Sequence, residues 1–372
     1  MVRPRKREAP LAVEGESPWE ALGEIEEYRA LSRIRLEQAV PVREPLVLIS
    51  QVQRSGGTLL SQLLDGHPEC HAHPHELKIG KPMKWDWPPL DLARPETWFE
   101  VLFEHNTVSH FLDGYQKPSS EARKRKKKKE TSVPYDVLPF TFVPRLQKAL
   151  FDSCVEATAI ESERDVLDCY FTSYFNAWLD NHNLYSGPKK VVTGFTPRLS
   201  MELERVERFF AAYPDGTLVS IVRDPRAWYA SATSHRKYYR RALEEAVGVW
   251  RHSTEAALAA DERFGARVVV LTYEELIEEP EATVTALADR VGIAMTPELL
   301  VPTFNGLPIR ANSIDNVKRY GILPERASAY REKLDGETIA RIEELAGDLY
   351  ERAAALAIQR RTEHAGGTTW ES

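Results

Sequence analysis

The chain has 372 residues, of which 42% are hydrophobic and 28% charged, and its formal net charge is −7. This length allows one large domain or two, and the composition is that of an ordinary globular protein. The acidic balance argues against nucleic acid as the main partner, because such binding needs a basic face. No run of about 18 apolar residues occurs, so no integral membrane segment is expected.

The cysteines and the N-terminal residues indicate the cellular compartment of the protein. The first residues are basic, but no apolar segment of a signal peptide follows them. Cys70, Cys154 and Cys169 are odd in number and form no C-x-x-C pattern. We therefore expect no disulfide framework, as in proteins of a reducing compartment. These features together predict a cytoplasmic protein.

Hydrophobic periodicity and proline positions divide the chain into successive segments. Strands alternating with helices over the central part predict a three-layer α/β/α fold with a mainly parallel sheet. The predicted segments are a disordered tail at 1–16, an N-terminal helix at 17–43, an α/β domain at 44–325, helices at 326–361 and a frayed tail at 362–372.

An irregular insertion at 78–140, interrupted by several prolines, contains a cationic run at 123–129. We interpret this run as a solvated loop, with a flap that recruits an acidic acceptor or an anionic donor as the alternative. The aromatic residues between 170 and 178 are predicted to be core.

The most informative segment begins with the apolar residues 46–49. They lead into the polar turn Gln53-Arg54-Ser55-Gly56-Gly57-Thr58, which opens an apolar helix. A strand, a tight turn and a helix N-terminus together favour an anion, because backbone N–H groups and the helix dipole point at it. Glycines let the backbone approach a ligand closely, and Arg54 adds a permanent charge. The segment is not a nucleotide-triphosphate loop, because no Lys-Ser/Thr pair follows the glycines.

A second segment has the same order of strand, turn and helix. Residues 217–222 predict a buried strand, and a helix is predicted to follow, with Asp224 as its N-cap. Arg223 then lies at the carboxyl end of a strand, where open α/β sheets bind ligands. Ser231 lies about two turns into the helix, and helical side chains lean toward the N-terminus. Arg223 and Ser231 are therefore expected to converge on one phosphate.

These two elements resemble the sulfotransferase superfamily that uses 3′-phosphoadenosine 5′-phosphosulfate (PAPS), and the pattern is nearest to bacterial and tyrosylprotein sulfotransferases. Residues 53–58 match the loop that holds the 5′-phosphosulfate. Arg223 and Ser231 match the 3′-phosphate motif at the family's spacing. The resemblance spans residues 44–325 and implies the P-loop-like sulfotransferase fold.

The resemblance also implies an activity. A sulfuryl group would pass from PAPS to a hydroxyl or amine of a small-molecule, glycan or lipid acceptor by in-line displacement, leaving 3′-phosphoadenosine 5′-phosphate (PAP). No metal is required, because the protein can supply the positive charge. The residues implied to bind the donor are Arg54, Ser55, Gly56, Gly57, Thr58, Leu59, Arg223, Ser231 and Ser313, of which Arg54 and Ser313 are also implied in catalysis.

The catalytic base is expected shortly after the first helix. In the tyrosylprotein branch a glutamate lies eight residues beyond the histidine of the D-x-H-P motif. Counting from His67 reaches His75, with Glu76 next to it. Glu76 has the family's residue type, whereas His75 belongs to the residue type whose unperturbed pKa suits a general base. We favour Glu76 and keep His75 as the alternative.

A further pattern consists of three alternating histidines. His71, His73 and His75 alternate, which would place them on one face of an extended segment. No metal site is predicted there, since Pro74 interrupts the segment and no H-E-x-x-H pattern is present.

Relatives often carry a lysine where this chain has Phe195. Arg198, Lys189 or a lysine of the 123–129 run is expected to replace its charge. Lys318 and Arg319 are interpreted as surface charges.

Two alternatives to a sulfotransferase remain at this point. One is a non-catalytic nucleotide-binding scaffold with the same fold, which the missing lysine leaves open. The other is an atypical P-loop kinase, against which the missing Lys-Ser/Thr pair counts. The sequence indicates neither the identity of the acceptor nor the oligomeric state.

Overall fold

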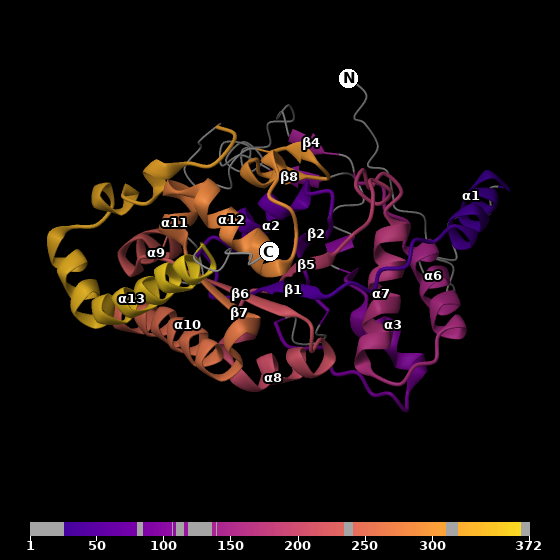
Figure 1. The fold of residues 1–372 in the computed structure, drawn as a ribbon, viewed down its shortest axis with the longest axis horizontal. Helices are drawn as coiled ribbons and strands as arrows, with labels where there is room; N and C mark the ends of the chain where they lie inside the picture. Colours follow the sequence, from indigo (N-terminus) through magenta and orange to yellow (C-terminus); the bar gives the residue numbers. More distant parts are fainter. Residues whose placement is uncertain are drawn as a thin grey trace, which may run out of the picture.

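Strand β1 (Leu46–Ile49) is buried along its whole length and forms the middle of a five-stranded sheet with the order β2-β5-β1-β6-β7 (Figure 1). The computed structural model describes residues 26–79, 85–105, 107–108, 115–117, 136–138, 140–233, 241–309 and 319–365. The other strands of the sheet are β2 (Cys70–Glu76), β5 (Val191–Phe195), β6 (Thr217–Val222) and β7 (Val268–Thr272). Every pairing is parallel, so the carboxyl ends of all five strands lie at one edge.

Helices cover both faces of the sheet because successive side chains of a strand point to opposite sides. Leu46 and Leu48 belong to one buried cluster, and Val47 and Ile49 belong to another. The first cluster includes residues of α7 (Glu163–Ala177), α8 (Leu203–Ala212), α10 (Leu243–Phe264) and α13 (Gly336–Ala365). The second includes residues of α2 (Gly57–Asp65), α11 (Tyr273–Glu278) and α12 (Pro280–Val291). The predicted three-layer α/β/α arrangement is confirmed.

The remaining elements lie around these layers (Figure 1). They are α1 (Glu26–Glu37), α3 (Trp98–Leu102), α6 (Pro144–Ala157), α9 (Pro225–Ala232), the antiparallel pair β3 (Tyr115–Lys117) and β4 (Asp136–Leu138), and the antiparallel pair β8 (Thr303–Phe304) and β9 (Leu307–Pro308). Short 3₁₀ turns precede α3, α8 and α13. The predicted tail at 1–16, the cationic run at 123–129 and Lys318 lie outside the described residues, as do residues 366–372 of the predicted tail at 362–372. Helix α13 continues through the first four residues of that tail, to Ala365.

The aromatic residues of α7 form core, as predicted. Tyr170, Phe171, Tyr174 and Phe175 are each no more than 1% exposed, and so is Trp178 just after the helix. Their rings contact one another and the strand β2, through ring pairs with His71 and His73. Helix α7 therefore closes the β2 edge of the sheet.

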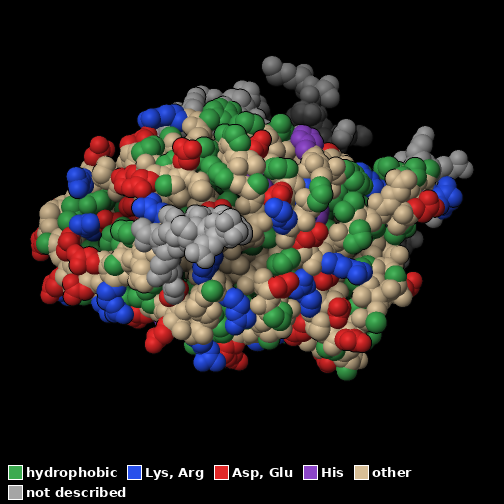
Figure 2. Space-filling view, viewed as in Figure 1, with side chains coloured by type: hydrophobic (Ala, Val, Ile, Leu, Met, Phe, Trp, Pro, Cys, Tyr) green, Lys and Arg blue, Asp and Glu red, His purple; other side chains and the backbone are tan. Residues whose placement is uncertain are grey.

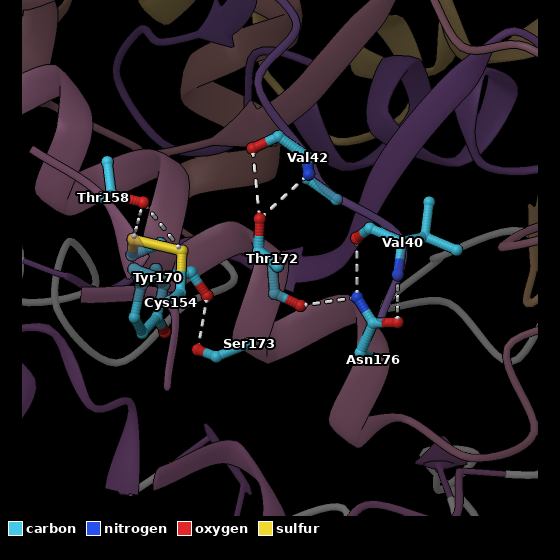
Figure 3. Close-up of a disulfide and its surroundings, with 9 residues drawn as sticks. Val40, Val42, Cys154, Thr158, Tyr170, Thr172, Ser173 and Asn176 are labelled. Carbon is cyan, nitrogen blue, oxygen red and sulfur yellow. Dashed lines mark hydrogen bonds between the residues drawn. A yellow bond between two sulfur atoms is a disulfide. The ribbon is translucent and has the colours of Figure 1, made fainter. Parts of the chain in front are cut away.

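One expectation from the cysteines is wrong. Cys154 of α6 and Cys169 of α7 form a disulfide, and the Thr158 hydroxyl lies 3.9 Å from each sulfur (Figure 3). An odd cysteine count does not reveal this pair, because the packing of two helices that are separate in sequence brings the two residues together. The disulfide removes one ground for the cytoplasmic location, which stays a prediction.

Helix α7 also fixes the chain that enters β1 (Figure 3). The Asn176 amide accepts from Val40 N and donates to Val40 O, at 2.9 and 2.8 Å. The Thr172 hydroxyl accepts from Val42 N at 2.9 Å. Buried backbone groups need such partners outside regular structure, so these bonds set where the central strand starts.

None of the helices in the described part of the chain combines the length and the apolar character that a membrane crossing needs. Figure 2 shows acidic and basic side chains interspersed over the visible face, in keeping with the modest net charge of the chain.

Candidate active site

The segment between β1 and α2 turns carbonyl groups toward the protein. Gln53 O accepts a hydrogen bond from the Trp228 indole at 2.9 Å. Arg54 O accepts one from the Arg223 guanidinium at 3.0 Å. With these carbonyls bonded inside the protein, the segment presents its N–H groups on the side where α2 begins.

The start of α2 offers unpaired donors. Gly56 is its N-cap and supplies no side-chain cap. Within the described chain no hydrogen bond takes up the N–H groups of Ser55, Gly56 or Thr58, whereas the Leu59 N–H donates to Gly56 O at 2.9 Å. The first N–H groups of a helix lack intrahelical partners and attract anions. The predicted loop therefore has the donors its function requires, and Leu59 has its own N–H already bonded.

Both loop glycines are required by their surroundings. Gly56 has φ +116°, and a Cβ there would lie 2.6 Å from the Tyr273 ring. A Cβ on Gly57 would lie 2.5 Å from the ring of Phe195. Real Cβ atoms do not approach other atoms so closely, so any side chain at either position would have to displace the ring packed against it.

Arg54 joins the two predicted motifs. Its Nε donates to the Ser231 hydroxyl at 3.1 Å, and its carbonyl accepts from Arg223. Arg54 has φ +78°, an uncommon conformation for a residue with a side chain. Strained residues of this kind gather at functional sites. The structure thus brings Arg223 and Ser231 together by way of Arg54.

Arg223 keeps one donor free of partners among the described residues. Its guanidinium lies 4.2 Å from the centre of the Tyr273 ring, while its buried Nε has no hydrogen-bond partner there. A buried N–H without a partner costs free energy unless a ligand or water satisfies it. An arginine and the donors of a helix start at one sheet edge form a site for an anion with several charged oxygens.

Tyr273 is a candidate site residue that the sequence analysis did not identify. Its ring lies against both Gly56 and Arg223. Its place directly after β7 was the available signal, because β7 ends at the same sheet edge as β1 and β6.

Two carboxylates, those of Asp224 and Glu274, stabilise the start of α9. The Asp224 carboxylate caps the helix by accepting from Arg226 N at 2.8 Å, and the Arg226 side chain donates to it at 2.6 Å. Glu274 accepts from Asp224 N at 3.1 Å and from the Tyr350 hydroxyl at 3.0 Å. Burial raises the pKa of Glu274 to about 7, an effect that the nearby charge of Arg223 opposes.

The candidate base lies at the end of β2. Glu76 pairs in register with Phe195, so it ends at the same edge as the loop after β1. Its carboxylate lies 3.4 Å from the Lys78 ammonium, and its side chain is 30% exposed. Sequence reasoning missed Lys78, although a lysine two residues beyond the candidate base was visible. His75 is half-buried beside Glu76.

The three alternating histidines do not form one array. His71 and His73 pack against rings of α7, and the strand pairing is irregular between Ala72 and Glu76. Burial lowers the pKa of His71 to about 3, so this ring is neutral. Over the described ranges no three His, Cys, Asp or Glu side chains gather as metal ligands would.

Phe195 is core rather than part of the charged site. It is 5% exposed and packs against Gly57. Of the cations expected to compensate, Arg198 follows β5 at the correct edge and its Nε donates to the Gln53 side chain at 2.6 Å. Lys189 instead precedes β5 and bonds Pro68 O at 2.6 Å, at the opposite edge. The lysines of the 123–129 run and Ser313 lie outside the described residues.

The fold and the loop define a three-layer α/β protein with a candidate anion site at the carboxyl edge of its parallel sheet. A model of the sulfotransferase family matches residues 45–297, more than half of the chain. The chain therefore belongs to the sulfotransferase family, as the two motifs indicated.

Solved structures similar to this chain include further sulfotransferases. The sulfotransferase domain from the curacin biosynthetic pathway is 17% identical, with a TM-score of 0.43 over 82% of this chain and 98% of that one. Sulfotransferase STF9 from Mycobacterium avium is 15% identical, with a TM-score of 0.39 over 88% and 80%. Retinol dehydratase in complex with retinol and PAP is 14% identical, with a TM-score of 0.34 over 85% and 86%. No curated protein sequence matches the chain.

Proposed function

We propose that the protein is a PAPS-dependent sulfotransferase that acts on a hydroxyl or amine of a small-molecule, glycan or lipid acceptor. The observation that carries the proposal is the junction at Arg54. One residue links the free N–H groups at the start of α2 to the motif of Arg223 and Ser231. The spacing of that motif is the one that 3′-phosphate binding uses in the family.

The residues of the site fit such a donor. The loop N–H groups and Arg54 offer donors for a phosphosulfate, and the unpartnered Nε of Arg223 offers one for a second phosphate. When bound, PAPS supplies a sulfuryl group on the 5′-phosphate oxygen. The acceptor oxygen or nitrogen forms the new bond to sulfur as the bond between sulfur and that phosphate oxygen breaks, leaving PAP.

The chain's own residues move the proton and balance the charge. Glu76, with His75 as the alternative, takes the proton of the acceptor. Arg54, Arg198 and the loop N–H groups stabilise negative charge that develops on the leaving phosphate. Lys78 forms an ion pair with Glu76, at 3.4 Å, and places a further positive charge beside the proposed base. These groups make a bound metal unnecessary.

Two other functions stay open and have distinct signatures. A non-catalytic scaffold would bind the nucleotide without turnover, and a kinase would prefer ATP. We propose a cytoplasmic location, which rests on the sequence alone.

Calorimetric titration with PAP, ATP and ADP tests the donor. We expect PAP to bind in preference to ATP, and Arg223→Ala to weaken PAP by at least about 30-fold, the loss typical of removing one partner of a buried charge pair. Arg263→Ala is the matched control, because Arg263 is exposed and its contacts are a surface ion pair with Glu207 and the ring of Phe264. Equal PAP affinity in all three proteins, or tighter ATP binding, would reject the proposal.

Turnover separates the enzyme from the scaffold. PAP release from PAPS is followed with phenol, alcohol and amine acceptors. Glu76→Gln should lower kcat by about 10²- to 10⁴-fold, the usual contribution of a general base, with PAP affinity retained. Glu96→Gln, at an exposed surface ion pair, is the control. If only His75→Ala has this effect, His75 is the base.

A further inference from the structure

A buried carboxylate lies behind the candidate base. The side chains of Glu104 and His73 are both 0% exposed, and Tyr170 is fully buried as well. Glu104 Oε1 accepts from the Tyr170 hydroxyl at 2.8 Å and lies 2.8 Å from His73 Nε2. Its other oxygen, Oε2, accepts from Lys78 N at 2.9 Å. Through this carboxylate, the segment of Glu104 is joined to residues 73–78 and to helix α7, which are far from it or from each other in sequence.

These contacts bracket Glu76 on both sides. Before it, His73 Nδ1 lies 2.9 Å from His75 O. After it, Lys78 N donates to Glu104. The intervening Leu77 N donates to Phe195 O at 2.8 Å, which ties the same stretch to β5. The backbone that carries the candidate base is therefore held by the sheet on one side and by the Glu104 group on the other.

Both ring nitrogens of His73 lie within hydrogen-bond distance of an oxygen, Nε2 of Glu104 Oε1 and Nδ1 of His75 O. A buried polar group costs free energy unless it is hydrogen-bonded. Glu104 meets this need, because it contacts His73 and accepts from the Tyr170 hydroxyl and Lys78 N.

We propose that Glu104 is a positioning residue for the reaction. With His73 and Tyr170 it holds residues 75–78 so that Glu76 is presented to the acceptor. The inference rests on the proposed function and on Glu76 or His75 as base. None of the hydrogen bonds of Glu104 described above involves the loop after β1, Arg223 or Ser231. Loss of Glu104 should therefore lower turnover and leave donor affinity unchanged.

Two matched substitutions on α7 test the positioning role of Glu104 and leave its own side chain in place. Tyr170→Phe deletes a hydroxyl bonded to Glu104, and Tyr174→Phe deletes one that has no hydrogen-bond partner among the described residues, one turn away on the same helix. We expect Tyr170→Phe to lower kcat by about 10-fold, the loss that corresponds to one hydrogen bond to a charged group. The Tyr174→Phe variant should match wild type, and PAP affinity should stay within about twofold in both.

Glu104→Gln is the stronger test, because an amide keeps the shape of the side chain and loses one of its two acceptor oxygens. Its kcat should fall by at least as much as that of Tyr170→Phe, and its PAP affinity should again stay within about twofold of wild type.

Two results would overturn the proposal: equal kcat for the two tyrosine variants, or donor affinity that falls in parallel with kcat. Failure of the proposed function is distinguishable, because it appears as absent PAP binding in wild type.

Discussion

Arg54 Nε lies 3.1 Å from the hydroxyl oxygen of Ser231, although 177 positions separate the two residues in sequence. The contact places the end of the turn after β1 against the second turn of α9. The contact joins into one candidate site two motifs that are separate in the sequence. Substitution of either side chain is therefore expected to change the affinity for the donor.

Ser231→Ala should weaken PAP binding by about 10- to 100-fold, the range for a hydrogen bond to a charged group. The hydroxyl accepts a hydrogen bond from Arg54, whose guanidinium is proposed to bind the donor. The control is Thr233→Ala on the same helix, whose hydroxyl bonds only Tyr229 O among the described contacts and should have no effect. Titration calorimetry measures both. Equal losses in the two variants would show that α9 as a whole, and not Ser231, carries the effect.

Gly57→Ala should destabilise the protein by about 1–3 kcal/mol, the usual cost of overpacking. The added Cβ would meet the side chains of Gln51 and Phe195. Gly248→Ala in α10 is the matched control, because a Cβ there meets nothing within 4 Å. Since alanine favours helix, that variant should gain up to about 1 kcal/mol. Denaturant unfolding measures the free energies, and a neutral Gly57→Ala would mean that Phe195 repacks freely.

The raised pKa of Glu274 predicts a dependence of stability on pH. Its folded pKa of about 7 lies above its ordinary value of 4.5 because of burial. The folded state then binds more protons than the unfolded state between these values, so this contribution is complete below pH 4.5 and is lost as pH rises through about 7. The effect is at most about 3 kcal/mol.

The neutral isostere Glu274→Gln lacks this dependence and retains an acceptor for Asp224 N. Its thermal midpoint should therefore rise relative to wild type as pH increases from 4.5 to 7. The control is Glu278→Gln, at an exposed position on the same helix. A constant difference between Glu274→Gln and wild type across this range would contradict the assignment of the shift to Glu274.

Reduction of the Cys154–Cys169 disulfide should destabilise the protein by about 3 kcal/mol, the value expected for closing a loop of 15 residues. Unfolding in urea with and without a thiol reductant measures the loss. Cys154→Ser should unfold like the reduced protein and should not respond to reductant. Identical curves for wild type in both conditions would show that the disulfide adds no stability.

Much of the site could be predicted from the sequence because its signals are local. A buried strand followed by a turn and a helix is encoded within a few residues, and both motifs have this form at 46–60 and 217–231. The parallel sheet then follows from strands alternating with helices. Since parallel strands end at one edge, even the meeting of Arg223 with the loop was foreseeable.

Other features depended on contacts between segments that are distant in sequence. The pairing of Cys154 with Cys169 follows from how α6 packs on α7, and the position of Lys189 follows from which end of β5 it adjoins. The role of Phe195 was equally hidden, because a ring against Gly57 is a packing relation and no local pattern records it.

The strand–turn–helix units, with their glycines and the charged residues at their ends, are encoded locally, since backbone propensity and hydrophobic period act over a few residues. Which groups are buried together depends on the folding of the whole chain. Glu104 shows the difference: it lies in an irregular insertion, yet folding encloses it with His73 and Tyr170. A carboxylate removed from water must find partners, and those partners come from segments that the fold alone brings into contact.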